Sequence, residues 1–565
     1  MDNNIITGKL IYNSRVITSE ELNIVVKRIE KIFISYLEDD EEIIAIALPR
    51  SPEMIATIFA ALKNNITFLI LDMEQPQYRL EYMLEKAEIK TVIASNDVMK
   101  KYVFNGKRVV SIDSLMTEKN VNLVKNPRKN DIAYVLFTSG TTGMPKAVAI
   151  KKEGLNNFLE AIPQIIEFNE DDIICCFTSG SFDIFFLEIL IPLYRGMTVV
   201  LASEKEKDNA RKIIKLIRKN KVTMLQMTPS RLKLLQTVDE RLECLMKIKK
   251  IMVGGEAFPL NILKLLQRNK KLRIYNMYGP TETTIWSTVS ELTDKEAIDV
   301  GKPILNTNVY LLDENNDLVC QGDVGEICIS GKGVAAGYLN DSILTQKSFV
   351  SIGSERIYKT GDLGKYDANN NLLCLGRKDE QIKIYGHRVE LNDIEANLEK
   401  MEYVNGIAAC YEQIRKAIVV FYISKKDIQD KELFEFAKLM LPSYMRPIKY
   451  IRVDQFIYTS SGKIDKKEML STYFYKKNEI TNNLLYDQIT NDIIDIIYEI
   501  QGDIIDSIDL NTKIEEIIIN SIDYVSLIVE IEEKFDIEFD IDKLAINEFS
   551  DIESLVMYVK NKIGG

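Results

Sequence analysis

One stretch constrains this chain more than any other: an apolar run that leads directly into a loop of glycine and hydroxyl residues. Residues 134–146 read Tyr-Val-Leu-Phe-Thr-Ser-Gly-Thr-Thr-Gly-Met-Pro-Lys. The apolar run over 133–137 predicts a buried strand. Because glycine lets the backbone approach a ligand closely, the loop can surround a phosphate with N–H groups and hydroxyls, or it can form an ordinary turn. It is not a Walker loop, since the G-x-x-x-x-G-K-[ST] spacing is absent.

The sequence around this loop predicts strands that alternate with helices. This order is typical of a mainly parallel sheet covered on both faces, where ligands bind at the carboxyl ends of the strands. The loop after residue 137 lies at such an end. The predicted strands are 43–48, 67–71, 91–94 and 198–201, and the predicted helices are 20–36 and 52–63.

Length and composition limit the class of protein. At 565 residues the chain is too long for one core, so we expect several domains. The N-terminus lacks the pattern of a signal peptide. The most apolar stretch, 181–194, contains Asp183 and Glu188 and is too short to cross a bilayer. Seven cysteines without C-x-x-C spacing indicate reduced thiols, and we expect a cytoplasmic protein.

The charge is unevenly distributed. Residues 484–565 hold 20 acidic and 5 basic residues, a net of −15 against −12 for the whole chain, which leaves the remainder at +3. An acidic terminal module on a near-neutral body argues against a nucleic-acid partner and suits docking on a basic protein face. The single histidine, His387, argues against a Ser/His hydrolase or a His-ligated metal site. We interpret it as a surface or interface residue.

Two isolated residues allow more than one interpretation. Asp183 stands in an apolar run, where an unpaired carboxylate is costly, so it either caps the helix that follows or binds a cationic ligand. Ser521 stands before an apolar helical pattern and is either a helix cap or a modified serine.

Taken together, the motifs resemble those of the adenylate-forming enzymes, which activate carboxylates with ATP, and in particular the adenylation domains of nonribosomal peptide synthetases. Met144 and Ala147 stand where that family often has Lys and Gly. The resemblance implies an α/β fold with a large multi-sheet N-terminal subdomain, residues 1–377, and a small α/β lid, residues 378–474. It rests on the 134–146 loop, Ser-Phe-Asp-Ile at 181–184, Tyr-Gly-Pro-Thr-Glu at 278–282, Tyr-Lys-Thr-Gly-Asp at 358–362, Gly-Arg-Lys-Asp at 376–379 and Ser-Gly-Lys-Ile-Asp at 461–465.

The resemblance assigns the nucleotide site. Tyr278 stacks on adenine, Asn276 helps to hold the base, Asp362 binds the ribose with Arg377 nearby, and Glu282 helps to coordinate Mg²⁺, which oxygen ligands suit. An ordinary capped turn is the alternative for the Gly-Pro segment. The remaining residues expected to bind ATP or its phosphates are Thr138, Ser139, Gly140, Thr141, Thr142, Gly143, Lys146 and Thr281.

The resemblance also assigns the amino-acid site. Asp183 binds the α-ammonium group, and none of the residues lining the side-chain pocket besides Asp183 and Lys463 is charged. The pocket is filled by large side chains, above all Trp286, in an order similar to that of glycine-activating domains. We therefore expect glycine as substrate, with alanine as the alternative. The lining residues are Asp183, Ile184, Leu187, Gln226, Met252, Gly254, Met277, Ile285 and Trp286, with Lys463 at the carboxylate.

Three further positions follow from the resemblance. Asp379 is the pivot of the lid, because two half-reactions need different walls around one site. Lys463 is the catalytic lysine, which neutralises charge between the attacking carboxylate and the α-phosphate. Gly386 lets a thiol arm pass close to the backbone.

The C-terminal part, residues 486–565, resembles an all-α, four-helix peptidyl carrier protein, joined to the lid by a linker at 475–485. Helices are expected at 487–500, 522–535 and 552–563. The resemblance makes Ser521 the attachment site of 4′-phosphopantetheine, although the usual Gly-x-Asp-Ser-Leu pattern reads Ile-Ile-Asn-Ser-Ile at 518–522, without the Gly and the Asp. A phosphopantetheinyl transferase is then required.

We therefore predict ATP- and Mg²⁺-dependent formation of an aminoacyl-AMP and its transfer as a thioester to the fused carrier. A downstream condensation or tailoring enzyme would take the product, and no nucleic acid or membrane partner is expected. One alternative is an acyl- or aryl-CoA-type ligase with a fused module, against which Asp183 argues. Another is a non-catalytic binding module on the same fold.

Overall fold

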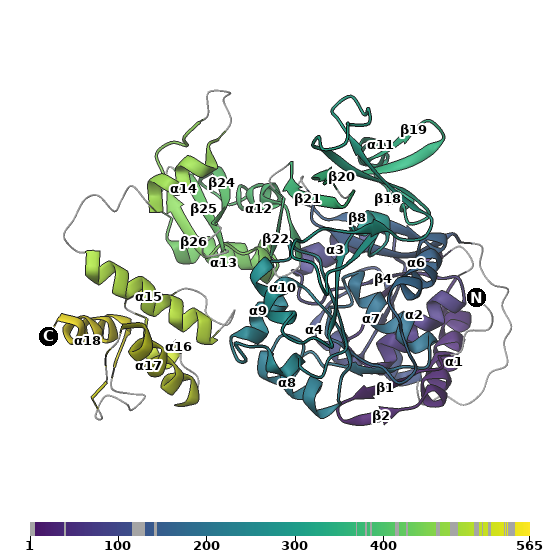
Figure 1. Ribbon diagram of the computed structural model, residues 1–565, viewed down its shortest axis with the longest axis horizontal. Coiled ribbons are helices and arrows are strands. Elements are labelled where there is room, and N and C mark those ends of the chain that lie inside the picture. The colour runs from purple at the N-terminus through teal and green to yellow at the C-terminus, as the bar shows by residue number, and fades with distance from the viewer. Residues whose placement is uncertain are drawn as a thin grey trace. The chain divides into compact units, whose positions relative to one another are not determined.

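The structure is a computed structural model in which two compact units are distinguished, Met1–Lys400 with Glu435–Arg446 and Met401–Phe434 with Pro447–Gly565 (Figure 1). Each unit is described separately. The residues described are 6–38, 41–115, 130–140, 144–368, 370–378, 381–384, 387–412, 417–424, 426, 428–458, 464–474, 484–501, 508–510, 512–517, 521–535, 537, 539–540 and 549–564.

The first unit contains a seven-stranded sheet in the order β18-β8-β7-β4-β3-β5-β6. The pairs from β7 through β6 are parallel, whereas β8 pairs antiparallel with β7 and with β18. The strands are β3 Ile43–Ala47, β4 Thr67–Ile70, β5 Thr91–Ala94, β6 Arg108–Ser111, β7 Ile132–Thr138, β8 Lys146–Lys151 and β18 Gly337–Tyr338.

A nine-stranded sheet of the same unit has the order β15-β14-β13-β12-β11-β9-β10-β1-β2 and is parallel from β13 to β1. Its strands are β1 Lys9–Tyr12, β2 Arg15–Ile17, β9 Ile173–Cys176, β10 Thr198–Leu201, β11 Met224–Met227, β12 Lys250–Gly254, β13 Arg273–Tyr278, β14 Thr288–Glu291 and β15 Lys302–Pro303.

An antiparallel sheet and a hairpin complete the strands of this unit. The sheet has the order β16-β17-β20-β19, with β21 also paired to β20, and the hairpin consists of β22 and β23. The strands are β16 Thr307–Leu312, β17 Gly325–Gly331, β19 Phe349–Ile352, β20 Glu355–Tyr366, β21 Leu372–Arg377, β22 Ile382–Ile384 and β23 His387–Val389.

Helices cover the two large sheets, and one hydrophobic core joins residues of both sheets with α1, α2, α6 and α7. Helix α7 is buried along almost its whole length, because Phe185–Leu193 contains one charged residue, Glu188. The helices are α1 Ser19–Tyr36, α2 Pro52–Lys63, α3 Gln77–Lys86, α4 Asn96–Lys101, α5 Ile112–Leu115, α6 Lys152–Ile165, α7 Ile184–Tyr194, α8 Ala210–Lys219, α9 Pro229–Gln236, α10 Leu260–Leu266, α11 Ser342–Ser348 and α12 Leu391–Leu398, with 3-10 turns at Glu243–Leu245, Thr281–Thr283 and Ser443–Met445.

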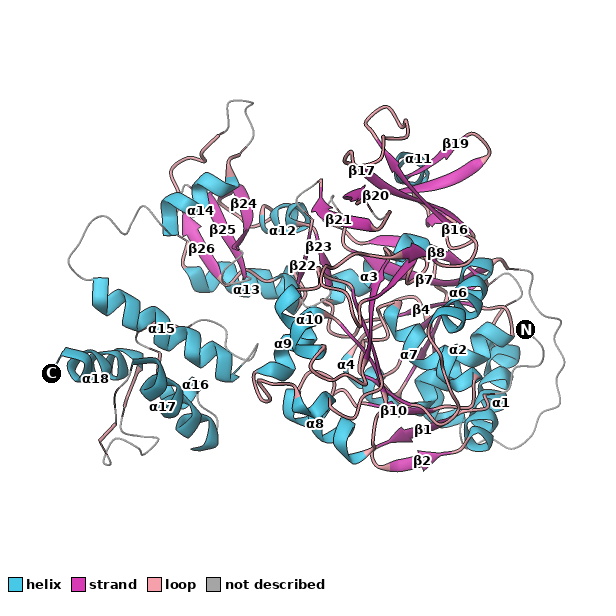
Figure 2. Cartoon of the chain, in the orientation of Figure 1, coloured by secondary structure: helices cyan, strands magenta, loops and turns pink. Residues whose placement is uncertain are grey.

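The second unit holds a three-stranded sheet, β24 Val404–Glu412, β25 Ala417–Ser424 and β26 Lys449–Arg452. Helix α14, Lys466–Phe474, packs on it through Met469. Helix α13, Asp430–Met440, starts in the second unit and ends in the first. Residues described between 484 and 564 form helices α15 Leu484–Gln501, α16 Ile514–Ile517, α17 Ser521–Phe535 and α18 Ile552–Gly564 around a core of their own, and this part has no strand among its described residues (Figure 2).

The elements predicted from the sequence are confirmed with small shifts in their bounds. The α2 prediction matches at both ends, where Ser51 caps the helix and Pro52 takes its first position, a residue pair that favours helix starts. Helix α15 begins three residues earlier than expected, inside the segment assigned to the linker. In the described parts of the chain, no helix is long and apolar enough to cross a membrane.

Candidate active site

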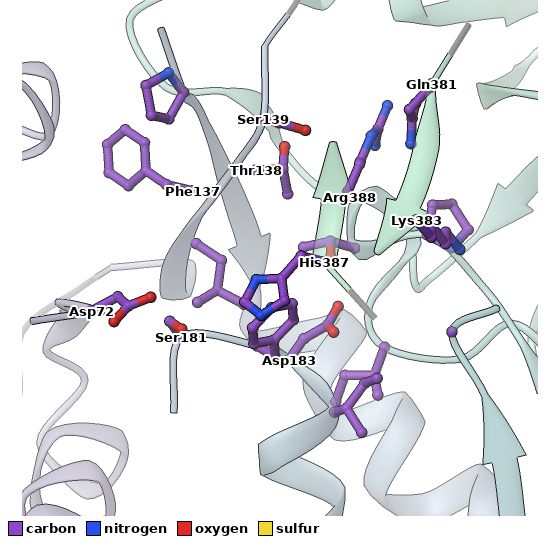
Figure 3. A pocket seen from close by; sticks show the side chains of 18 of the residues that line it. Asp72, Phe137, Thr138, Ser139, Ser181, Asp183, Gln381, Lys383, His387 and Arg388 are labelled. Carbon is purple, nitrogen blue, oxygen red and sulfur yellow. The ribbon is translucent and has the colours of Figure 1, made fainter. Parts of the chain in front are cut away.

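Asp183 lies at the first turn of α7 with 6% of its surface exposed. It takes the N-cap position, but its side chain makes no capping hydrogen bond, and its Oδ2 has no partner among the described residues. Burial raises the pKa of Asp183 to about 6. The Asp183 carboxylate and the cavity both lie within the first unit, and the carboxylate is a buried hydrogen-bond acceptor in the cavity wall (Figure 3).

The cavity beside Asp183 is lined by residues from distant parts of the first unit. They come from the end of β7, the loop before α7, the turn after β13, the strands β20 and β21, the β22–β23 hairpin and the segment before Arg446. The end of β7 and the turn after β13 lie at the carboxyl ends of parallel strands, as the sequence predicted, whereas β20–β23 contribute from antiparallel pairs.

Trp286 lines the cavity and is 2% exposed. Its indole Nε1 donates a hydrogen bond to Gln226 Oε1 at 3.3 Å. At Gly254, a Cβ would lie 2.7 Å from Trp286 Cη2, so only glycine leaves room for the indole. Two β-branched residues just before it, Thr284 and Ile285, have left-handed φ values of 65° and 67°, an uncommon strain that turns the chain at this site.

The structure brings only part of the predicted amino-acid pocket to the cavity wall. Asp183, Ile184, Ile285 and Trp286 line it. The remaining residues are buried without lining it: Leu187, Gln226, Met252, Gly254 and Met277.

Of the residues predicted to bind the nucleotide, some line the cavity and others do not. Tyr278 and Asp362 both line the cavity, and the Tyr278 hydroxyl donates to Asp362 Oδ2 at 2.7 Å. Arg377 Nη1 donates to the other oxygen, Oδ1, at 3.3 Å. Thr281 also lines the cavity. Asn276 differs from the expectation, because it is buried away from the wall and its amide donates to the carbonyl of Asp299 at 2.8 Å.

The phosphate loop begins where β7 ends. Thr138 and Ser139 line the cavity, and their hydroxyl oxygens are buried with no hydrogen-bond partner in the described part of the chain. Such unsatisfied hydroxyls fit an anionic ligand. Gly140 follows them, and Thr141, Thr142 and Gly143 lie outside the described residues. Lys146 begins β8, and its Nζ lies 3.7 Å from Glu390 Oε1.

Glu282, the expected Mg²⁺ ligand, is fully buried and already paired. Arg388 Nη1 donates to its Oε1 at 2.9 Å and to its Oε2 at 3.2 Å, and the Tyr338 hydroxyl donates to Oε1 at 2.8 Å. Burial opposes ionisation, yet the Arg388 charge and the hydrogen bonds hold the pKa of Glu282 below its usual value. The arrangement therefore does not fit a metal ion, and the described residues contain no cluster of three acidic, His or Cys side chains that could hold one.

His387, interpreted from the sequence as a surface or interface residue, is partly buried and lies in the wall of the cavity. Its ring stacks on Tyr444 with centroids 3.7 Å apart, and the edge of Phe182 approaches at 4.6 Å. Burial, reinforced by the charge of Lys207, lowers the pKa of His387 to about 3, so the imidazole is neutral at physiological pH. Local sequence missed this, because Phe182 and Tyr444 are remote in the chain.

The remaining predicted residues have little or no described structure. Lys463 and Asp379 lie outside the described residues. Tyr458 and Ile464 form an antiparallel bridge on either side of the lysine-bearing segment. Ser521 is the first residue of α17, and its side chain is outside the described set. Gly386 is likewise not described.

Asp183, the hydroxyl residues Thr138 and Ser139, and the hydrogen-bonded pair Tyr278–Asp362 thus line one cavity of the first unit. Residues 9–339 match the family model of the AMP-binding enzymes, and the chain belongs to this family. It is an adenylate-forming domain with the multi-sheet α/β fold expected of one.

Individual relatives place the chain more narrowly. It is 33% identical over 467 residues to a dimodular nonribosomal peptide synthase of Bacillus subtilis, which covers 80% of this chain and 19% of that protein. The next relatives, tyrocidine synthase 3 and gramicidin S synthase 2, are matched over 7% and 11% of their lengths. The chain thus spans less than a fifth of these curated relatives.

Solved structures show the same fold. The holo form of PA1221, a protein with adenylation and PCP domains, superposes with a TM-score of 0.75 at 22% identity and covers 98% of this chain and 94% of that chain. AB3403, a four-domain nonribosomal peptide synthetase bound to AMP and glycine, superposes with a TM-score of 0.61 at 25% identity, covering 99% of this chain and 42% of that chain.

Proposed function

We propose that this chain activates a small amino acid, glycine first, as aminoacyl-AMP and transfers it as a thioester to 4′-phosphopantetheine on Ser521. The observation that carries the proposal is the Asp183 carboxylate, buried and with Oδ2 unpartnered among the described residues, on the wall of a cavity that also contains Tyr278 and Asp362. Such a carboxylate is costly unless it binds a cation, and the α-ammonium group of an amino acid is one.

The size of the substrate is inferred from Trp286. Its indole lines the cavity, donates a hydrogen bond to Gln226 and packs against Gly254, where no side chain fits. A pocket filled by its own wall rejects a larger side chain by steric clash, which costs far more than a lost contact. AB3403, which is bound to AMP and glycine, supports the same assignment. Alanine is the nearest alternative.

The nucleotide would be held at three points. The unsatisfied hydroxyls of Thr138 and Ser139, with the backbone of residues 140–143, accommodate phosphate, and Asp362 accepts hydrogen bonds from ribose hydroxyls. Tyr278 supplies a flat surface for adenine, fixed by its bond to Asp362. The substrate carboxylate attacks the α-phosphorus, pyrophosphate leaves, and the aminoacyl-AMP anhydride results.

Lys463 is proposed as the catalytic residue of this step, because an ammonium group neutralises charge that develops between the carboxylate and the α-phosphate. We propose Asp379 as the pivot that exchanges the walls of the site between the two half-reactions. The corresponding division is an adenylation subdomain over 1–377, a lid over 378–474, a linker over 475–485 and a carrier over 486–565.

In the second half-reaction the pantetheine thiolate attacks the acyl carbon, the thioester forms and AMP leaves. Ser521 begins the 15-residue helix α17, where N–H groups and the helix dipole favour the phosphate of the arm. Tethering the carrier raises its effective concentration. A phosphopantetheinyl transferase is required for attachment, and a condensation or tailoring enzyme would accept the product.

ATP–pyrophosphate exchange across the amino acids tests the proposal. Glycine should give the strongest exchange, and Asp183→Asn should remove it while the fold is retained. Strongest exchange with an aromatic or acidic amino acid would refute the assignment. Thioester on free CoA instead of on the protein would favour an acyl- or aryl-CoA-type ligase, and absence of exchange with every substrate would favour a non-catalytic module.

A further inference from the structure

Tyr134 is a buried tyrosine of β7 whose hydroxyl the proposed function does not use. Side chains alternate regularly from Tyr134 to Thr138, because the pairing of β7 with β8 is unbroken over these residues. Tyr134 therefore shares a face of the strand with Leu136 and Thr138, and both of these line the cavity that contains Asp183 (Figure 3). The tyrosine precedes them on that face and is 0% exposed.

The Tyr134 ring packs against the first turn of α7. Its centroid lies 4.4 Å from that of Phe186, whose backbone N–H donates to the carbonyl of Asp183 at 2.9 Å. The ring of Phe68 lies 5.9 Å away on the neighbouring strand β4. The tyrosine thus connects the strand that leads into the phosphate loop with the helical turn that carries Asp183.

Two buried polar atoms of this arrangement have no hydrogen-bond partner in the part of the chain that the structure describes. They are the Tyr134 hydroxyl oxygen and Asp183 Oδ2. A buried hydroxyl without a partner costs free energy, so one that is kept in a folded core calls for an explanation. A hydroxyl can donate a hydrogen bond and an ionised carboxylate accepts one, so the two groups are chemically complementary.

The two groups also interact electrostatically. Burial, reinforced by the charge of Asp183, raises the pKa of Tyr134 well above its usual value, so the hydroxyl keeps its proton throughout the physiological pH range. The carboxylate charge aligns this O–H dipole, and the aligned dipole in turn favours the ionised form of Asp183 in surroundings of low polarity.

Other charged groups also surround Asp183. Burial is the main cause of its raised pKa, and the charge of Glu282, which is paired with Arg388, adds to it. Glu188, on α7 itself, is fully buried. Replacing Tyr134 by phenylalanine alters none of these groups, so a comparison of the two proteins isolates the hydroxyl. The remaining Asp, Arg, Lys and His side chains of the cavity wall are Asp72, Arg79, Asp362, Arg377, Lys383 and His387.

We propose that Tyr134 is a positioning residue of the amino-acid site, whose hydroxyl directs its proton toward Asp183 and stabilises the ionised carboxylate that receives the ammonium group of the substrate. The proposal rests on the proposed function, because it takes Asp183 as the ammonium site. Tyr134 acts through Asp183 and does not contact the substrate, since it is not among the residues that line the cavity.

The first test compares pH profiles of kcat/KM for glycine, measured with the full chain by ATP–pyrophosphate exchange. Tyr134→Phe removes one oxygen and keeps the ring packing. It should move the midpoint of the acid limb upward by about half to one pH unit, which is a loss of about threefold to tenfold below the midpoint. Above pH 8 the loss should nearly disappear, because Asp183 is then ionised in both proteins.

Tyr275→Phe is the matched control. Tyr275 is also 0% exposed, and its hydroxyl likewise has no partner among the described residues. The charges that act on it are those of Glu291, Arg273 and Glu167. Its pH profile should therefore coincide with that of the unaltered chain.

The second test needs no substrate. At pH 7, Tyr134→Phe should lower the Tm of the unaltered chain by about 1–3 °C. In the Asp183→Asn background it should leave the Tm unchanged or raise it, because the hydroxyl then has no charge to stabilise. At pH 4 Asp183 is protonated, so the effects in the two backgrounds should become nearly equal.

Three results would overturn the proposal: a loss in kcat/KM that is equal at all pH values, a shift of the midpoint shared by Tyr275→Phe, or equal effects on Tm in both backgrounds at pH 7. Amino-acid-dependent exchange by the unaltered chain tests the proposed function separately. Coupling in Tm without any exchange would overturn only the proposed function, and exchange without coupling would overturn only the role of Tyr134.

Discussion

Trp286 donates its indole N–H to Gln226 at 3.3 Å, and this bond helps to fix the ring in the wall of the cavity that Asp183 also lines. The relationship makes a prediction about substrate size. In Trp286→Ser, the space of the indole opens, so exchange with larger apolar amino acids should rise at least tenfold relative to glycine. The panel of amino acids used for the unaltered chain measures this ratio. An unchanged order of preference would contradict the pocket assignment.

The buried Asp183 predicts how amino-acid use depends on pH. Its pKa is raised to about 6 by burial, and an ammonium group binds the ionised form. The kcat/KM for the amino acid should therefore fall about tenfold per pH unit below about 6, since this parameter reports ionisation of the free enzyme. The KM for ATP should not follow the same profile. A flat amino-acid profile between pH 5 and 7 would count against Asp183 as the ammonium site.

The same shift predicts a change in stability. The native state binds the Asp183 proton more tightly than the unfolded state, so stability should fall as pH rises from about 4 to about 6 and then level off. At neutral pH, the raised pKa of Asp183 lowers the free energy of unfolding by about 3 kcal/mol. Asp183→Asn should remove most of it, raising the free energy of unfolding at pH 7 but barely at pH 4. Equal effects at both pH values would contradict this.

Glu188 is predicted to position the loop that carries Asp183. It is fully buried and accepts from the Thr178 backbone N–H at 3.2 Å and from the Thr178 hydroxyl at 2.5 Å. The guanidinium of Arg50 holds the carbonyls of Cys176 and Thr178 on the other side. Glu188→Ala should raise the KM for the amino acid about tenfold or more and leave the KM for ATP nearly unchanged.

Glu188→Gln is the matched variant, because it can still accept from Thr178 and should recover most of the loss. Removing one partner of a buried charged network costs about 3–5 kcal/mol of stability, so thermal unfolding of both variants should be measured beside the two KM values. A parallel rise of both KM values, with no rescue by glutamine, would indicate a purely structural role.

Much of the fold and part of the site could be predicted from the sequence. The β7 strand and its loop, α2 with its Ser51 cap, and Asp183 at the start of α7 are local features, so short-range patterns indicate them. The contacts of Arg388 with Glu282, 106 residues apart, and of His387 with Tyr444 depend on tertiary packing. The alternation of side chains along a strand predicts which residues share a face, but it does not predict which other element packs against that face.

The same limit explains Asn276. Asn276 lies two residues before Tyr278 on β13, on the same face of the strand, which suggested a nucleotide contact. Its amide donates instead to the carbonyl of Asp299, a partner 23 residues away that the local sequence does not indicate. For Glu282, the local motif predicted a metal ligand. In the structure its carboxylate pairs instead with Arg388, which comes from strand β23 and could not be predicted from the residues around Glu282.

Lys463 carries the proposed chemistry of adenylate formation. Lys463→Ala should lower ATP–pyrophosphate exchange by about 10²–10³-fold, the range found when one group that stabilises developing charge is removed. Transfer from chemically supplied glycyl-AMP to the holo-carrier should be much less affected, because that step does not use the charge between carboxylate and α-phosphate. Full exchange activity in Lys463→Ala would show that Lys463 is not the catalytic residue of adenylate formation.

The most direct test is the intact mass of the full chain after phosphopantetheinylation and incubation with ATP, Mg²⁺ and a mixture of amino acids. We predict an increase by one glycyl group, located on the arm at Ser521 and absent when Ser521 is replaced by alanine. A chain that gains no acyl group, or gains one elsewhere than Ser521, would contradict the central claim that this protein loads an amino acid onto its own carrier.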